Sequence, residues 1–236
     1  MKKLGIVLFV IILFGSCKDK PNDSAENLEG NPLTSNTQLS EIFKEYHQGE
    51  LKIDPISATR AGDTRYNDRF VNGLNDSVKD GIKLFYTTYL EKVSHFADQD
   101  LNETELLSKR ILEWECTQNI KRLSLPDYTP IDQMWSVNLV MGQFKTVQDY
   151  ENWLKRVDQF LVWFASARGK MEEGIKNGYV LPKSLIVKVI PQMEAMAKED
   201  LENHLYYTPV KLLPESFTDE EKTKLKNDYR SMVLEK

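Results

Sequence analysis

The densest group of chemically versatile side chains lies between residues 60 and 69, where three arginines, two aspartates, a tyrosine and an asparagine occur together. An arginine guanidinium binds a carboxylate through two parallel hydrogen bonds, so this cluster is suited to the rim of a cleft that recognises acidic groups. The alternative is a structural loop held together by its own Asp–Arg pairs. The candidate rim or loop residues are Arg60, Asp63, Arg65, Tyr66 and Asp68.

Catalytic and metal-ligating patterns are hard to find elsewhere in the sequence. There is no His-Glu dipeptide of the kind that starts a zinc helix, no Gly-x-Ser-x-Gly elbow and no glycine-rich phosphate loop. The three histidines, His47, His95 and His204, are scattered, and we expect them at surfaces or helix ends. The sequence therefore predicts no catalytic residue, no metal ligand and no cofactor for this chain.

The N-terminus carries the most specific chemical signal. Two lysines precede an apolar run from Leu4 to Phe14, and Gly15-Ser16 lead into Cys17. The run is too short to span a bilayer, so residues 1–16 are predicted to be a signal peptide. Small residues before a cysteine resemble the bacterial lipobox, which predicts cleavage ahead of Cys17 and a diacylglycerol on its thiol. An ordinary signal peptide with an incidental cysteine is the alternative.

Residues 17–36 are predicted to be the lipidated cysteine and a flexible linker, because this segment is polar and has little apolar surface to bury. Without residues 1–16 the chain has 29 basic and 36 acidic residues, a net charge of −7, which argues against a nucleic-acid partner. The predicted partner is a membrane, through the lipid on Cys17. The expected location is the bacterial cell envelope at the outer membrane, with the periplasmic and surface faces both open. Cys116 then lacks an intramolecular partner and is expected to be a small core residue.

Helical periodicity runs through most of residues 37–236, and no segment alternates as a strand would. The expected fold is all-α, a multi-helix array around one long central helix at about 146–177. The uncharged run 134–141 is expected to be buried and either extended or irregular. The other expected helices cover 39–47 (ended by Gly49), 55–61, 76–96, 103–125, 182–197 (with a kink or a fresh start at Pro191) and 219–236.

Apolar spacing also predicts which helix faces are buried. The central helix should begin at Thr146, with Asp149 in its capping box, and stop at Asn177-Gly178. Its expected core face carries Val147, Tyr150, Leu154, Val157, Leu161, Phe164, Met171 and Ile175. The expected core face of the helix after Asn102 carries Leu106, Leu107, Ile111, Trp114 and Ile120.

Four spaced segments together resemble a known family, the bacterial domain of unknown function 885. They are Ile56-Ser57-Ala58-Thr59 with Gly62-Asp63 and Arg65-Tyr66-Asn67-Asp68, then Asp132 to Trp135, Phe144 to Tyr150, and Gly174 to Pro182. The resemblance covers about Gln38 to the end. It implies a helical fold similar to Taq-type carboxypeptidases, a predicted zinc peptidase activity and, for many members, a lipid anchor.

The family's zinc site lies in a C-terminal half that carries a His-Glu-x-x-Pro-Gly-His helix, and this sequence has no such motif. The resemblance therefore implies that residues 37–236 correspond to the N-terminal half, non-catalytic alone, with zinc expected only in a complementary C-terminal half. The helical pattern that reaches Lys236 fits either the front part of a longer polypeptide or a C-terminal helix. Two further hypotheses stay open: a stand-alone lipoprotein that binds a peptide or protein, and a complete enzyme that uses the 60–69 cluster.

Overall fold

The computed structural model describes residues 36–131, 144–197 and 200–235. The chain divides into two units, Met1–Pro32 and Leu33–Lys236, and every described residue belongs to the second. The predicted signal peptide, Cys17, the linker up to residue 35 and the apolar run 134–141 lie outside the described residues, so these predictions are not tested by the fold.

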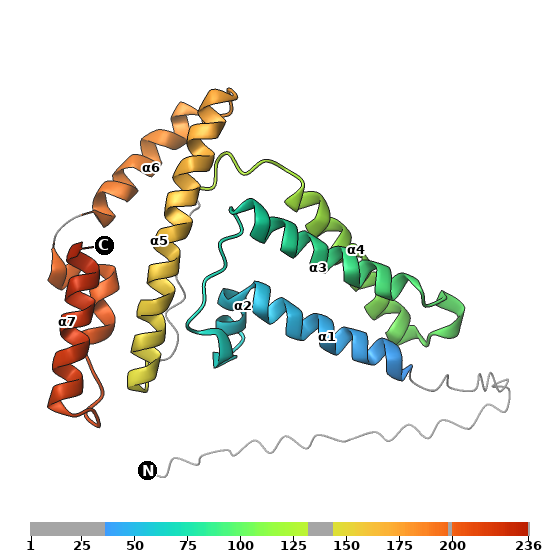
Figure 1. Cartoon of the computed structure of the whole chain (residues 1–236), viewed down its shortest axis with the longest axis horizontal. Coiled ribbons are helices and arrows are strands. Elements are labelled where there is room, and N and C mark those ends of the chain that lie inside the picture. Colours follow the sequence, from blue (N-terminus) through green and yellow to red (C-terminus); the bar gives the residue numbers. More distant parts are fainter. Residues whose placement is uncertain (1–35, 132–143, 198–199, 236) are drawn as a thin grey trace, which may run out of the picture. The chain divides into compact units, whose positions relative to one another are not determined.

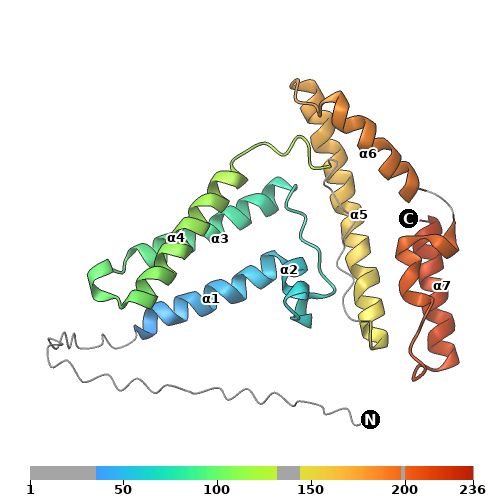
Figure 2. The same ribbon diagram turned by 180° about the vertical axis from the view of Figure 1, so that it is seen from behind.

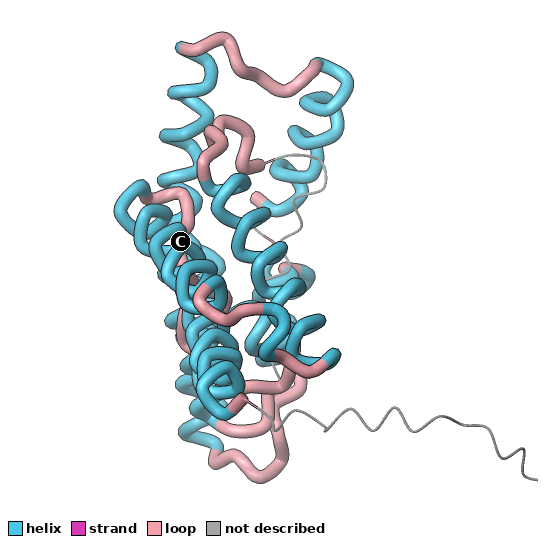
Figure 3. The backbone as a smooth tube through the Cα atoms, turned by 90° about the vertical axis from the view of Figure 1, so that its right-hand side faces the viewer, coloured by secondary structure: helices cyan, strands magenta, loops and turns pink. Residues whose placement is uncertain are grey.

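The described part of the chain is all-α, as the sequence predicts, with helices and connecting loops and no strand (Figures 1 and 3). No described helix is long and apolar enough to cross a membrane. The α-helices are α1 (Thr37–Ile53), α2 (Pro55–Arg60), α3 (Asp76–Ser94), α4 (Glu103–Leu123), α5 (Val147–Lys176), α6 (Lys183–Met196) and α7 (Asp219–Glu235), and the short 3-10 helices are η1 (Thr64–Tyr66), η2 (Asp98–Asp100), η3 (Leu201–Asn203) and η4 (Leu205–Val210).

Local capping sets most helix starts where the sequence places them. Thr146 begins α5 with a reciprocal capping box, in which the Asp149 side chain accepts from the Thr146 backbone N–H at 2.8 Å. Asn102 and Glu105 form the same arrangement at α4. These contacts satisfy backbone donors that a helix start leaves without partners. The predicted long helix is therefore confirmed.

The predicted end of the first helix at Gly49 is wrong, because α1 continues to Ile53. A Cβ on Gly49 would lie 2.2 Å from Cε2 of Phe85 on α3. Glycine is present here because α1 and α3 approach closely, and that packing offsets its poor helix propensity. The helix is capped by Asn36, whose side chain accepts from the backbone N–H of Leu39.

Helices α1, α3 and α4 share one hydrophobic core, and α3 and α4 lie side by side in both ribbon views (Figures 1 and 2). Cys116 is fully buried there, which confirms its expected place in the core. The predicted face of α4 is wrong in part: Leu107, Ile111 and Trp114 are 55–66% exposed. Apolar residues occur on both sides of α4, so spacing alone did not identify the side that meets α3. The buried residues of α4 are Glu105, Lys109, Leu112, Cys116 and Leu123.

A second core joins α5 to η4 and α7 and is mainly aromatic. The indole of Trp153 stacks on the Tyr229 ring at 5.2 Å, and the Tyr229 hydroxyl donates to the Tyr150 carbonyl at 3.1 Å. The predicted stripe of α5 is shifted, because Trp153 and Phe160 are buried and Ile175 is exposed. The helix packs against α7 and η4 in one core and against α6 in another, so its buried residues do not lie on one stripe.

Helix α6 packs its Val189 against Ala167 of α5, in a small core with Leu74 and Ile131. It runs without a break through Pro191, so the alternative of a fresh helix start at that residue is wrong. Proline has no N–H to donate to the carbonyl of Val187, four residues earlier. The helix continues because this is the loss of a single hydrogen bond.

Candidate functional site

The loop after α2 pairs its own charges. The Arg65 guanidinium donates from Nη2 to Asp63 Oδ2 at 2.6 Å and from Nε to both carboxylate oxygens at 3.0 Å. These bonds, with a further one from the Arg65 backbone N–H, lower the pKa of Asp63 to about 2. A carboxylate with so low a pKa is a poor general base at neutral pH. Its geometry favours the structural-loop alternative for this pair.

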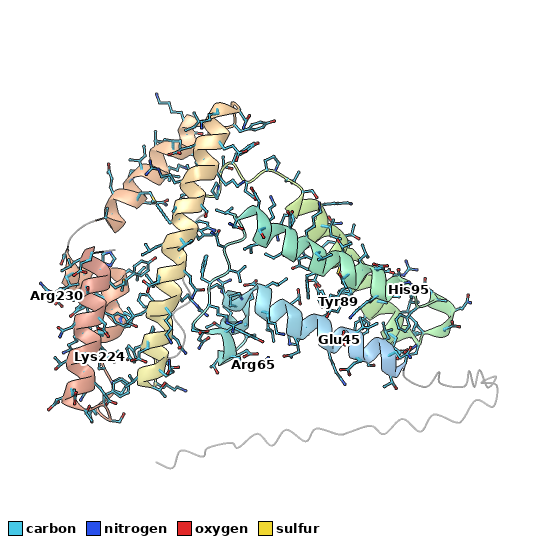
Figure 4. All side chains as sticks on the ribbon, viewed as in Figure 1. Glu45, Arg65, Tyr89, His95, Lys224 and Arg230 are labelled. Carbon is cyan, nitrogen blue, oxygen red and sulfur yellow. The ribbon has the colours of Figure 1, made fainter. Side chains whose placement is uncertain are left out.

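Tyr66 lies between two arginines. Its ring is buried, and the Cζ atoms of Arg65 and Arg69 lie 5.4 and 5.3 Å from the ring centroid. Figure 4 shows Arg65 on the outside of this loop. Asp68 lies 3.8 Å from Arg69, whereas exposed Arg60 forms no ion pair with any other described residue. The structure thus brings together Asp63, Arg65 and Tyr66, and it leaves Arg60 apart from them.

Arg156 of α5 organises this loop, although it is not among the site residues predicted from the sequence. Its side chain is 1% exposed, and Nη2 donates to Thr59 Oγ1 at 2.8 Å and to the Tyr66 carbonyl at 2.9 Å. Burial lowers the pKa of Arg156 to about 10, and nearby Asp68 opposes that shift. The guanidinium therefore stays charged at neutral pH and fixes the loop to the long helix.

Further polar side chains of α5 continue this attachment. Gln159 accepts from the Phe70 backbone N–H at 2.9 Å and donates to the Asp68 carbonyl at 2.7 Å. Two turns later, the Ser166 hydroxyl accepts from the Asn72 side-chain amide at 2.8 Å. Lys170 forms an ion pair with Asp76 at the start of α3, with Nζ and Oδ1 2.8 Å apart. These polar residues of α5 recur at helical spacing, at 156, 159, 166 and 170, and that spacing is the signal that would have identified this face.

Two glycines of the family-like segments, Gly62 and Gly178, close helices in the left-handed region. At the end of α5, Gly178 has φ +77°, its N–H donates to Ile175, and the Tyr179 N–H donates to the Gly174 carbonyl at 2.8 Å. At the end of α2, Gly62 has φ +88° and the same pair of bonds forms. This is the Schellman arrangement, in which glycine is favoured. The predicted stop at Asn177-Gly178 is confirmed, and α2 ends within one residue of the expected range.

An acidic group lies near the α1–α3–α4 core. The Tyr46 hydroxyl donates to Glu50 Oε1 at 2.9 Å. Burial, with Glu115 nearby, raises the pKa of Glu50 to about 7, and the hydrogen bond from Tyr46 opposes that rise. Burial also raises the pKa of the Cys116 thiol to about 12, so this cysteine is a weak nucleophile at neutral pH.

The described residues do not fit a zinc site. Nowhere among them do three His, Cys, Asp or Glu side chains come close enough to hold a metal ion. His47 and His95 are exposed, and His204 accepts from the Tyr206 backbone N–H at 3.3 Å at the start of η4. No catalytic step through zinc follows from these residues.

Comparison with known proteins gives one family match. A family model described as "Bacterial protein of unknown function (DUF885)" matches residues 55–236. No curated protein and no solved structure gives a significant match. The matched range begins at α2 and includes each described helix after it, whereas α1 lies upstream of the match.

Proposed function

The chain belongs to the DUF885 family of bacterial proteins, and we propose that it is a lipid-anchored envelope protein that supplies a helical, non-metal-binding wall of a peptidase-like fold. The membership confirms the resemblance inferred from the sequence. In this proposal the chain is non-catalytic alone, and zinc-binding residues come from a complementary C-terminal half.

The observation that carries this proposal is the structural use of three family-like segments. Thr59 and Tyr66, from the first segment, accept hydrogen bonds from buried Arg156. Thr146, from the segment before α5, caps that helix, and Gly178 ends it. These residues position helices and present no nucleophile or general base. Their use supports the proposal that this part of the chain is a structural wall.

The close packing around Gly174 supports the same assignment. A Cβ at this position would lie 2.8 Å from both the Tyr128 Cβ and the Tyr179 carbonyl oxygen. The rings of Tyr128 and Tyr179 are 5.3 Å apart. The end of α5 is thus fixed against the segment that follows α4.

Lipid attachment is tested by labelling cells with radioactive palmitate. The wild-type protein should be labelled and membrane-bound, whereas Cys17→Ser should be neither. An unlabelled wild type, or equal labelling of the variant, would remove the anchor from the proposal. The thiol of Cys116 is buried and serves as the internal control, since Cys116→Ala should be labelled like wild type.

The origin of a complementary half is tested separately, by the genomic DNA after the codon for Lys236. A reading frame there that encodes a His-Glu metal helix would support the proposal, and its product should co-purify with this chain. Without such a frame, or without co-purification, the two-half version fails.

A second candidate is a stand-alone lipoprotein that binds a peptide or protein on its helical surface. It is favoured by Leu107, Ile111 and Trp114, which form an exposed apolar stripe along α4. Residues spaced in this way are typical anchors for a partner helix. This candidate predicts a monomer with one sharp unfolding transition, whereas a wall that lacks its complement should melt broadly or self-associate.

A further inference from the structure

The end of α5, the turn after it and most of α6 carry an unusual combination of charges. Residues 174–193, called here the hairpin tip, form the longest stretch of the chain without Asp or Glu, although the whole chain has 36 acidic residues. Three lysines lie within it, Lys176, Lys183 and Lys188, and all three are exposed. None of the three forms an ion pair with another described residue.

The same segment exposes apolar side chains. One group is at the turn and the other is on the outer side of α6, opposite the buried Val189. Figure 1 shows α5 and α6 joined as this hairpin. The exposed apolar residues, each 50–65% exposed, are Ile175, Tyr179, Val180, Val187 and Ile190.

We propose that the hairpin tip docks on an anionic phospholipid bilayer. Lysines interspersed with exposed apolar residues suit an interfacial helix, since the apolar groups enter the headgroup region and the ammonium groups reach the lipid phosphates. Tyr179 has the amphipathic ring that is enriched at membrane interfaces. A two-fold contact between two hairpin tips would place lysines against lysines, so charge complementarity favours the anionic bilayer over a second copy of the chain.

The exposed apolar stripe on α4 differs from the hairpin tip in the charge of its surroundings. Leu107, Ile111 and Trp114 are exposed to a similar degree. Their helix also carries Glu103, Glu105, Glu113 and Glu115 beside its basic residues. Mixed charge of this kind gives no attraction to an anionic surface, so α4 serves as a matched control.

This inference rests on the proposed lipid anchor, which brings the chain to a membrane, and adds that a second contact orients it there. The diacylglycerol would hold the chain at the bilayer through its two acyl chains, and the hairpin tip would add an orienting contact at the far end of α5 from Thr146.

The test uses the full mature chain from residue 17 with Cys17→Ser, which carries no lipid. Failure here is thus distinct from failure of lipidation, which the palmitate experiment measures. Vesicles of phosphatidylcholine and phosphatidylglycerol in equal parts are compared with pure phosphatidylcholine by co-sedimentation. Binding is expected only to the anionic vesicles, and it should weaken between about 0.05 and about 0.5 M NaCl because salt screens the lysines.

Two variants remove the proposed contact, Val187→Asp with Ile190→Asp, and Lys183→Glu with Lys188→Glu. Each should lower the vesicle partition coefficient by about tenfold or more. In the lysine pair, each lysine near an anionic surface contributes about fivefold. In the other pair, two apolar side chains are replaced by carboxylates that the anionic headgroups repel. The control, Leu107→Asp with Ile111→Asp on α4, should bind like wild type. Circular dichroism confirms that each variant is folded.

Several results would overturn the proposal. They are no binding to anionic vesicles, equal binding by the hairpin variants, or an equal loss in the α4 control. A dimer in analytical ultracentrifugation that Val187→Asp with Ile190→Asp abolishes would assign the surface to a second copy instead.

Discussion

Arg156 and Tyr66 are 90 residues apart in sequence, and Nη2 of Arg156 lies 2.9 Å from the Tyr66 carbonyl oxygen. This contact joins the long helix α5 to the loop that contains the densest group of charged residues. It explains why that loop folds on itself, with Arg65 paired to Asp63 outside and the tyrosine ring buried. The cluster that first suggested ligand recognition is attached to the helix by a buried cation.

Arg156→Met should destabilise the protein by about 2–3 kcal/mol, because the Tyr66 carbonyl and Thr59 hydroxyl lose a charged donor inside the protein. Urea denaturation followed by circular dichroism measures the change. Arg168→Met on the same helix is the control. Its exposed ion pair with Glu172 should contribute no more than about 0.5 kcal/mol. Equal effects of the two substitutions would contradict the role given to Arg156.

Gly49→Ala should destabilise the protein by about 1–3 kcal/mol, although alanine is the better helix former. The added Cβ would meet the Phe85 ring, which would have to shift within its aromatic contacts with Tyr46, Tyr86 and Tyr89. Gly169→Ala in α5 has no neighbour within 4 Å and should stabilise by about 0.5–1 kcal/mol. Thermal unfolding of both variants tests this difference in sign, and a stabilising Gly49→Ala would show that the helices are less closely packed.

Glu50 should make stability fall as pH rises. Its pKa is about 7 in the folded protein against 4.5 in the unfolded chain, so the folded state binds more protons between these values. The contribution of Glu50 to stability is therefore greatest below pH 4.5 and is lost as pH rises through about 7. Glu50→Gln keeps an acceptor for the Tyr46 hydroxyl and removes the charge.

The variant should consequently be more stable than wild type at pH 8, by about 1 kcal/mol after allowance for the partial exposure of Glu50. The two proteins should differ least near pH 5. Melting temperatures at both pH values measure this difference. A constant difference between the two would show that Glu50 does not titrate in this range.

Features set by local chemistry could be predicted from the sequence. The capping boxes at Thr146 and Asn102, and the glycine stops at Gly62 and Gly178, depend on residues within one or two turns. For the same reason the all-α class and the extent of α5 were predictable from helical period and end signals.

Features set by packing could not be predicted in the same way. Gly49 ends no helix because Phe85, from a different helix, lies against it. Trp114 is exposed because α3 packs on the other side of α4. Arg156 is buried through contacts with a loop 90 residues away. Each of these outcomes depends on a partner that the local sequence does not specify.

The zinc content of the purified chain tests the central claim most directly. After equilibrium dialysis with zinc and return to metal-free buffer, inductively coupled plasma mass spectrometry should find well below one zinc ion per chain, because no three ligating side chains converge among the described residues. One zinc ion retained per chain, accompanied by zinc-dependent peptidase activity, would contradict the assignment of this chain to a non-metal-binding wall.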